Sequence, residues 1–142
     1  LSCHRIGDYQ FSYDRMLRFE GNTAAFILYA YVRIAGIKRK VNADIDVIKK
    51  TDRIYLEHPS EIALGLHIIQ FGEALNTVAN ELLPNRLTDY LYAMAEKFNA
   101  FFRDCRVEGV VQQSSRLLLC EAAASVMKRG MEILGLKVVD KM

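Results

Sequence analysis

The amino-acid sequence predicts an all-α domain, a bundle of long helices joined by short loops. Three observations favour this fold class. Only Pro59 and Pro84 interrupt the 142 residues. Apolar residues recur at steps of three and four over long stretches, which is the spacing of one face of a helix. No stretch alternates apolar and polar residues beyond a few positions, as a half-buried strand would.

Residues 1–11 form a leading segment ahead of the first predicted helix. Ser12 can cap this short helix, which runs through Phe19, because a serine hydroxyl accepts a hydrogen bond from a free backbone N–H. The Gly21-Asn22 pair then breaks the chain, and the next helix is predicted over Thr23–Lys40. Its predicted apolar seam, at steps of three and four, consists of Ala25, Leu28, Val32 and Ala35.

The middle of the chain predicts a short helix followed by a longer one. Asp44 ends a loop and is expected to cap a short helix that finishes near Lys50. Pro59 suits the first turn of the next helix, where its missing N–H leaves no hydrogen bond unmade. That helix can run to Leu83, and Gly72 is a point at which it can bend or split.

The last two helices have the clearest periodicity. Pro84 restarts the pattern with Asn85 as the predicted N-cap, and the apolar seam that follows is Leu87, Leu91, Met94, Phe98, Phe101 and Cys105. Residues 107–114 form a loop or a brief extended piece, after which Ser115 is expected to cap the final helix. The predicted seam of that helix is Leu117, Cys120, Ala124, Met127, Met131 and Leu134. Gly135 follows in the position where a left-handed residue closes a helix.

The composition argues against a disordered chain and against a membrane protein. With 51% hydrophobic residues and a net charge of +2, the chain has enough apolar surface for a core. The longest uncharged run, Gly21–Val32, has 12 residues, whereas roughly 20 are needed to cross a bilayer. The three cysteines lack the spacing of a disulfide framework and indicate reduced thiols. No export signal is visible, so we expect a cytoplasmic location without a membrane partner.

No catalytic or metal site is expected. The sequence has no Gly-rich phosphate loop, no GxSxG elbow and no HExxH pair. His4, His58 and His67 are scattered, and no Cys–His spacing matches a zinc site. Cys120 lies among alanines in a predicted helix, which indicates a buried structural thiol rather than a nucleophile. We therefore predict neither a catalytic residue nor a cofactor in these 142 residues.

A stripe of aromatic and basic residues on the second predicted helix is the strongest binding candidate. Phe26, Tyr29 and Arg33 stand at steps of three and four, and Gly36 and Lys40 continue the line. Flat rings and a guanidinium suit unstacked bases, because rings stack on bases and arginine stacks or donates paired hydrogen bonds. The alternative is that both rings belong to the core and that Arg33 pairs with a carboxylate.

Basic residues gather around the end of the same helix. The seven cations within 21 positions are Arg33, Lys38, Arg39, Lys40, Lys49, Lys50 and Arg53. Such a run is typical of a solvated helix end, and a phosphate-facing patch is the alternative. A net charge of +2 lacks the strongly basic balance of proteins that grip many phosphates, so DNA is not an expected partner. Arg116, which precedes the apolar run LLLC, is predicted to make a buried structural pair.

The stretch Met16–Lys40, MLRFEGNTAAFILYAYVRIAGIKRK, resembles the opening of the anticodon-binding (DALR) domain of arginyl-tRNA synthetases. Members of that family carry a Gly-Asn/Asp-Thr turn and then Tyr-Ala-x-x-Arg, here Gly21-Asn22-Thr23 and Tyr29 to Arg33. The resemblance continues in LPNRLTDYLYAMAEKFNAFFRDCRVEG, in RLLLCEAAASVMKRGMEILGL and in the tail Val-Asp-Lys-Met. Four pieces in the right order cover nearly the whole chain, and they look most like the eukaryotic cytosolic type.

The resemblance implies a helical bundle of the DALR type that holds the anticodon loop of arginine tRNA with its bases splayed out. It places Phe26, Tyr29 and Arg33 on the helix that reads the anticodon. Phe102 and Arg106 match two further contact positions, and Met142 matches a terminal residue whose side chain and carboxylate lie beside the anticodon.

Two positions depart from the family pattern. The family often has Tyr at the position of Phe102, so a hydroxyl is lost while stacking survives. It often has an aromatic residue at the position of Arg106, where contact would become guanidinium stacking or phosphate pairing.

The resemblance also implies that residues 1–142 are the C-terminal fragment of a longer class I synthetase. The HIGH-like and KMSKS-like signatures of its catalytic Rossmann domain are absent here, so that domain would be a partner of this one. ATP, with magnesium, would be a substrate of the full-length enzyme. Two other readings stay open: a non-catalytic DALR adaptor that presents arginine tRNA to a modifying enzyme, and a helical module that binds a partner protein.

Overall fold

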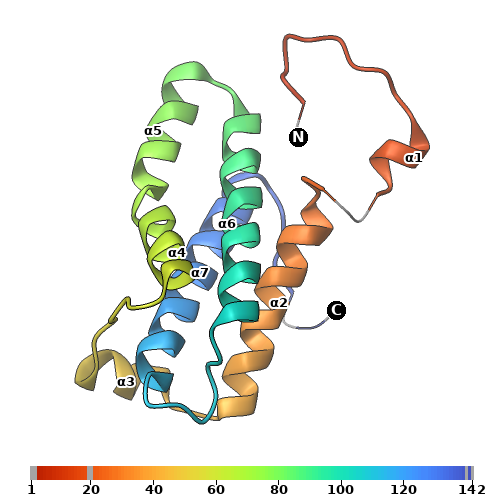
Figure 1. The fold of residues 1–142 in the computed structure, drawn as a ribbon. Helices are drawn as coiled ribbons and strands as arrows, with labels where there is room; N and C mark the ends of the chain where they lie inside the picture. The colour runs from red at the N-terminus through yellow and green to blue at the C-terminus, as the bar shows by residue number, and fades with distance from the viewer. Residues whose placement is uncertain (1–2, 19–20, 140, 142) are drawn as a thin grey trace.

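The computed structural model describes residues 3–18, 21–139 and 141, which form seven helices and no strand (Figure 1). The predicted all-α fold is therefore confirmed. The helices are α1 (Tyr13–Met16), α2 (Ala24–Val41), α3 (Ile45–Thr51), α4 (Pro59–Ile69), α5 (Phe71–Glu81), α6 (Pro84–Asp104) and α7 (Gln113–Ile133). Helix α6 packs against α2, α4, α5 and α7, so it is the central helix of the bundle.

The centre of the core lies between α6 and α7. All six apolar positions predicted for α6 are buried, with Leu91, Met94 and Phe98 fully enclosed. Gly130 of α7 permits the close approach of the two helices, because a Cβ atom there would lie 2.6 Å from Cδ2 of Leu91. Burial of this many large apolar side chains supplies the main driving force for folding.

The predicted seam of α2 was wrong by one or two positions. The buried residues of α2 are Ile27, Ala30 and Ile34, each at most 2% exposed. The predicted residues Ala25, Leu28, Val32 and Ala35 are only partly buried. Because α2 is apolar on most of its circumference, spacing alone does not identify the face that packs against both α6 and α7.

The structure shows how the first three predicted helices begin. Asp44 caps α3 as predicted, since its side chain accepts hydrogen bonds from the backbone of Asp46 and Val47. Ser12 occupies the N-cap position of α1 without a capping hydrogen bond, and α1 ends at Met16. The predicted end at Phe19 lies outside the described residues. Helix α2 begins after Thr23, whose hydroxyl accepts from the backbone N–H of Phe26 at 3.3 Å.

The long middle helix is split at Gln70 rather than at Gly72, and α4 and α5 are bent by 42° across this break. Over the described chain, no single helix has the length and hydropathy to cross a bilayer. Only α4 and α5 taken together pass that test, by length and composition alone.

Two predicted caps were wrong. Helix α6 starts with Pro84 in its first turn and Leu83 as N-cap, so Asn85 is a helical residue. Helix α7 starts at Gln113, two residues before Ser115. The Ser115 hydroxyl instead donates to the carbonyl oxygen of Tyr55 at 3.0 Å and accepts from its N–H at 2.8 Å. It therefore ties the segment before α4 to α7, a long-range role that a local capping rule does not predict.

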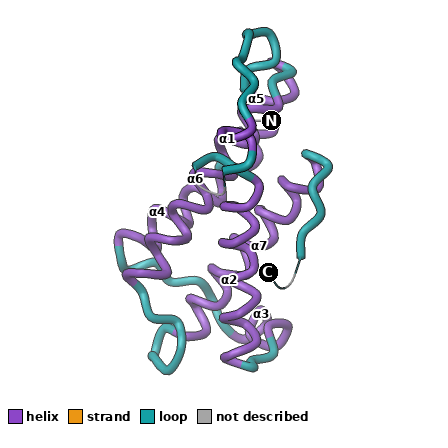
Figure 2. The backbone as a smooth tube through the Cα atoms, turned by 90° about the vertical axis from the view of Figure 1, so that its right-hand side faces the viewer, coloured by secondary structure: helices purple, strands orange, loops and turns teal. Residues whose placement is uncertain are grey.

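The two ends of the described chain differ in how they meet the bundle. Gly135 has a φ of +76° after α7, as predicted for a left-handed helix end, and the N–H of Leu136 bonds to the carbonyl of Met131. The segment before α2 runs out from the bundle (Figures 1 and 2). At residues 3–14, 17 and 18, where burial is described, its side chains are largely exposed, with Ile6 and Tyr13 above 70%.

Candidate nucleic-acid interface

The predicted stripe of α2 lies at the edge of its buried face, next to α6. It is offset by one position from the buried residues Ile27, Ala30 and Ile34. Phe26 is partly buried and its ring lies 5.1 Å from the ring of Tyr92 on α6. Tyr29 is 50% exposed, and Arg33, one turn further on, is exposed.

Arg33 reaches across to α6. Its Nη1 donates to the side-chain oxygen of Asn99 at 2.7 Å, and its guanidinium carbon lies 5.0 Å from the centroid of the Phe102 ring. A guanidinium at this distance from a ring centroid makes a cation–π contact. Within the described part of the chain, no carboxylate pairs with Arg33. Among the described residues, the polar partner of Arg33 is therefore Asn99 and not the carboxylate of the predicted alternative.

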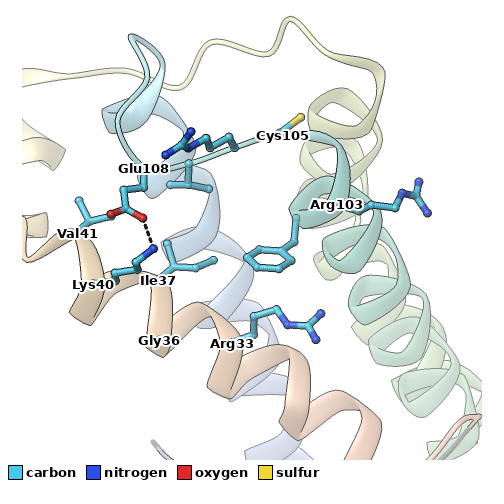
Figure 3. A pocket seen from close by; sticks show the side chains of 11 residues that line it. Arg33, Gly36, Ile37, Lys40, Val41, Arg103, Cys105 and Glu108 are labelled. Atoms are coloured by element: carbon cyan, nitrogen blue, oxygen red, sulfur yellow. Dashed lines mark ion pairs between the residues drawn. The ribbon is translucent and has the colours of Figure 1, made fainter.

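An open pocket of about 540 Å³ lies between the second half of α2 and the end of α6 (Figure 3). This volume is in the range of sites that hold a small molecule or one group of a larger ligand. The residues that line it come from α2, from the end of α6 and from the loop after α6: Arg33, Gly36, Ile37, Lys40, Val41, Phe102, Arg103, Cys105, Arg106, Val107 and Glu108.

Two of the four cations of the pocket are neutralised by neighbouring carboxylates. Lys40 pairs with Glu108 across the pocket (Figure 3). Arg103 points away from α2 and pairs with Asp104, which lowers the pKa of that carboxyl to about 2. Arg33 and the exposed Arg106 have no ion pair over the described residues. The pocket therefore combines one exposed ring, Phe102, with two uncompensated guanidinium groups, the chemistry that suits a base and its phosphate.

Residues 27–142 match the model of the DALR anticodon binding domain family. The chain belongs to this family. It is 70% identical over its whole length to the arginine–tRNA ligase of Protochlamydia amoebophila (strain UWE25), and covers 24% of that protein. It is 47% identical over its whole length to the cytoplasmic arginine–tRNA ligase of Arabidopsis thaliana, again covering 24%. The DALR domain thus spans about a quarter of the length of the curated relatives it matches.

Solved structures of the same family have the same fold. The arginyl-tRNA synthetase of Plasmodium falciparum superposes with a TM-score of 0.88 at 38% identity, over 99% of this DALR domain and 25% of that chain. The Thermus thermophilus enzyme superposes with a TM-score of 0.77 at 26% identity, over 93% of this chain and 23% of that one. The narrower prediction of a eukaryotic cytosolic type is not confirmed, because a bacterial relative reaches 70% identity.

Of the six contact positions predicted for this DALR domain, three line the pocket: Arg33, Phe102 and Arg106. Phe26 and Tyr29 lie further along α2, toward its N-terminus. Met142 lies outside the described residues.

Sequence reasoning missed two polar residues of the site. Asn99 orients Arg33, and Glu108 neutralises Lys40. The available signal for Asn99 was its position three residues before Phe102 on one face of a helix. No signal of this kind marks Glu108, because its loop meets α2 only in the folded chain.

The remaining chemical candidates are structural. Cys120 is fully buried and burial raises the pKa of its thiol to about 12, as expected for an inert side chain. His67 contacts the backbone oxygen of Tyr90 at 3.0 Å and stacks on its ring. Over the described residues, no group of three or more His, Cys, Asp or Glu side chains is placed to hold a metal ion.

The basic run around the end of α2 is largely paired. Lys38 and Lys49 both bond to Glu121 of α7, and together they tie α2 and α3 to that helix. Lys50 and Arg53 are exposed. The exposed residues fit the predicted solvated helix end, and the ion pairs with Glu121 are a feature that was not predicted.

Proposed function

We propose that this DALR domain binds the anticodon loop of arginine tRNA as the C-terminal part of an arginine–tRNA ligase. The family match over residues 27–142 and the relatives named arginine–tRNA ligase support the proposal. The observation that carries it is Arg33, which Asn99 holds above the exposed ring of Phe102. Arg33 and Arg106 line the pocket and have no ion pair within the described residues.

Recognition would combine stacking with a few polar contacts. Once the loop bases are unstacked, they expose their hydrogen-bonding edges to side chains. Each base that stacks on a ring contributes roughly 1–3 kcal/mol, so Tyr29 and Phe102 suffice for useful affinity. Arg33 would stack on a base or donate two hydrogen bonds to its edge, and Arg106 would meet a phosphate or a base face. Phe26 and Met142 stay predicted contacts of the same surface.

The charge balance fits this mode of binding. A module that reads bases by stacking does not need the many phosphate contacts of a strongly basic protein. The net charge of +2 is therefore compatible with RNA binding, with the rest of the parent enzyme binding the phosphates of the tRNA backbone.

The chemical step would belong to the rest of the parent enzyme. ATP, with magnesium, would be a substrate bound there, and the catalytic domain would be the intramolecular partner of this one. We propose a parent enzyme that acts in the cytoplasm, although one 45% identical relative is the chloroplastic/mitochondrial enzyme of Arabidopsis thaliana. The type we propose is broader than the eukaryotic cytosolic one, because it spans bacterial and plant relatives.

A gel-shift assay with anticodon stem-loops tests the proposal. We expect the chain to shift the stem-loop of arginine tRNA at concentrations at which the stem-loop of an unrelated tRNA stays free. Equal affinity for both stem-loops, or no binding by a chain whose circular dichroism spectrum is helical, would contradict the proposal and favour a module that binds protein. The sequence preceding residue 1 separates a ligase from an adaptor, since a ligase carries HIGH-like and KMSKS-like motifs there.

A further inference from the structure

A buried ion pair joins the start of α7 to α4. Arg116, in the first turn of α7, donates from Nε to Oε1 of Glu61 on α4 at 2.6 Å. The side chain of Arg116 is 13% exposed and that of Glu61 is 1% exposed. A pair this far from water needs further hydrogen bonds to offset the cost of desolvation.

Both partners of the pair have such hydrogen bonds. Oε2 of Glu61 accepts from the backbone N–H groups of Glu57 and His58, at 2.9 and 2.8 Å. Burial by itself raises the pKa of Glu61, but these bonds and the Arg116 guanidinium outweigh it and hold that pKa below its usual range. Glu61 is therefore charged at neutral pH and orients Arg116.

The second contact of Arg116 leads to the pocket. Its Nη1 donates to the backbone carbonyl oxygen of Arg106 at 2.7 Å. Arg106 and its neighbours Cys105, Val107 and Glu108 line the pocket. The guanidinium of Arg116 thus holds the backbone of this loop from inside the protein, while the side chain of Arg106 is exposed on the other side.

The start of α4 also holds the end of α6. The Ser60 hydroxyl donates to Oδ2 of Asp104 at 2.6 Å, and Asp104 is the last residue of α6. The loop that starts at Cys105 is therefore held at two points. Ser60 bonds to Asp104 just before the loop, and Arg116 bonds to the backbone of Arg106 within it.

We propose that Arg116 and Glu61 are positioning residues for the binding of the anticodon loop. They act through Arg106: the fixed backbone sets where its guanidinium meets the ligand, so less side-chain and loop freedom is lost on binding. This inference rests on the proposed function, because it assigns a role within the same binding site.

The test is a double-mutant cycle between Arg116 and Arg106, with the affinity for the arginine-tRNA stem-loop as the readout. Arg116→Lys keeps the charge opposite Glu61 but replaces the fork of donors by a single ammonium, so it cannot hold both partners in the same geometry. We expect R116K to raise the Kd by about fivefold in the otherwise unchanged chain and by less than about twofold in the R106A background.

Each outcome of the cycle is decisive. If R116K weakens binding equally in both backgrounds, the pair is merely structural and the positioning role is wrong. If the unmodified chain does not bind the stem-loop at all, the proposed function fails and the positioning role fails with it. If R116K does not fold by circular dichroism, the near-isosteric Glu61→Gln carries the same cycle, with the same coupling to Arg106 expected and additivity again contradicting the proposal. Arg86→Lys, at the far end of α6, is the control and is expected to leave the Kd unchanged.

Discussion

The contact between α2 and α6 has two ends, and the same stripe of α2 has a different role at each end. Toward the N-terminus of α2, the ring of Phe26 packs on the ring of Tyr92, and this contact fills the space between the two helices. Toward the C-terminus, Arg33 stands over the ring of Phe102 and the helices border an open pocket. An aromatic residue at helical spacing therefore does not mark a binding site by itself. What distinguishes the open end is a guanidinium that has no counter-ion among the described residues and lies above an exposed ring.

The two ends also differ in the sign of their charge. Along the closed end, α6 carries Asp89 and Glu96, and the hydrogen bond with Glu96 raises the pKa of Tyr92. At the open end, the guanidinium groups of Arg33 and Arg106 have no ion pair within the described residues. We expect these two guanidinium groups to attract a polyanionic ligand.

Removal of Arg33 is the substitution with the largest expected effect. Arg33→Ala deletes both the guanidinium and its contact with Phe102, so we expect the affinity for the arginine-tRNA stem-loop to fall by about 1–3 kcal/mol. Because Arg33 is exposed and its contacts with Asn99 and Phe102 lie at the surface, the free energy of unfolding should change by less than about 1 kcal/mol. Fluorescence titration and thermal denaturation measure the two quantities.

The matched control for Arg33→Ala is Arg86→Ala. Arg86 is an exposed arginine that pairs with Glu81 near the start of α6. Its removal changes the net charge by the same amount and should hardly change stability, since exposed ion pairs contribute little to it. Because Arg86 does not line the pocket, the affinity should stay within about twofold of the unmodified chain. If the two variants lose affinity equally, overall charge and not the pocket between α2 and α6 determines binding.

Phe26→Ala tests the closed end and should act mainly on stability. The ring is partly buried against the core and contacts Tyr92, so we expect a loss of about 2 kcal/mol from the free energy of unfolding. Urea denaturation measures this loss. A stability equal to that of the unmodified chain, together with a lower affinity for the stem-loop, would place Phe26 in the ligand site instead and remove the contrast between the two ends.

The parts of this fold that sequence predicts are those with one apolar face. Helix α6 has polar residues between its apolar positions, so the buried set from Leu87 to Cys105 follows from spacing alone. Helix α2 is apolar on most sides, and the choice of Ile27, Ala30 and Ile34 as its buried face depends on where α6 and α7 lie. The start of α7 was missed for a related reason, because Ser115 bonds to the distant Tyr55 instead of capping its own helix.

The candidate site was predictable in its residue types but not in its contacts. Arg33 stood out because a guanidinium followed two rings at helical spacing, in a motif of the family. Its neighbours Asn99 and Phe102 lie on another helix, so only the folded chain brings the three together. Arg116 was expected to be structural because a buried run follows it, and its buried pair with Glu61 agrees. The contact of Arg116 with the pocket loop adds a connection that no local pattern contains.

Asn99→Ala has the smallest expected effect on affinity. It removes the Arg33–Asn99 hydrogen bond and leaves the Arg33–Phe102 contact, so it separates what these two contacts contribute to binding. Asn99 does not line the pocket surface, yet its amide oxygen accepts from Arg33 and limits the motion of that side chain. Without this bond Arg33 keeps its contact with Phe102 but must lose more rotamer freedom on binding, which costs about 0.5–1 kcal/mol. We expect a two- to fivefold higher Kd for the stem-loop with unchanged selectivity against other tRNAs. A loss as large as that of Arg33→Ala would mean that Asn99 itself contacts the RNA, and that the site extends along α6 toward the closed end.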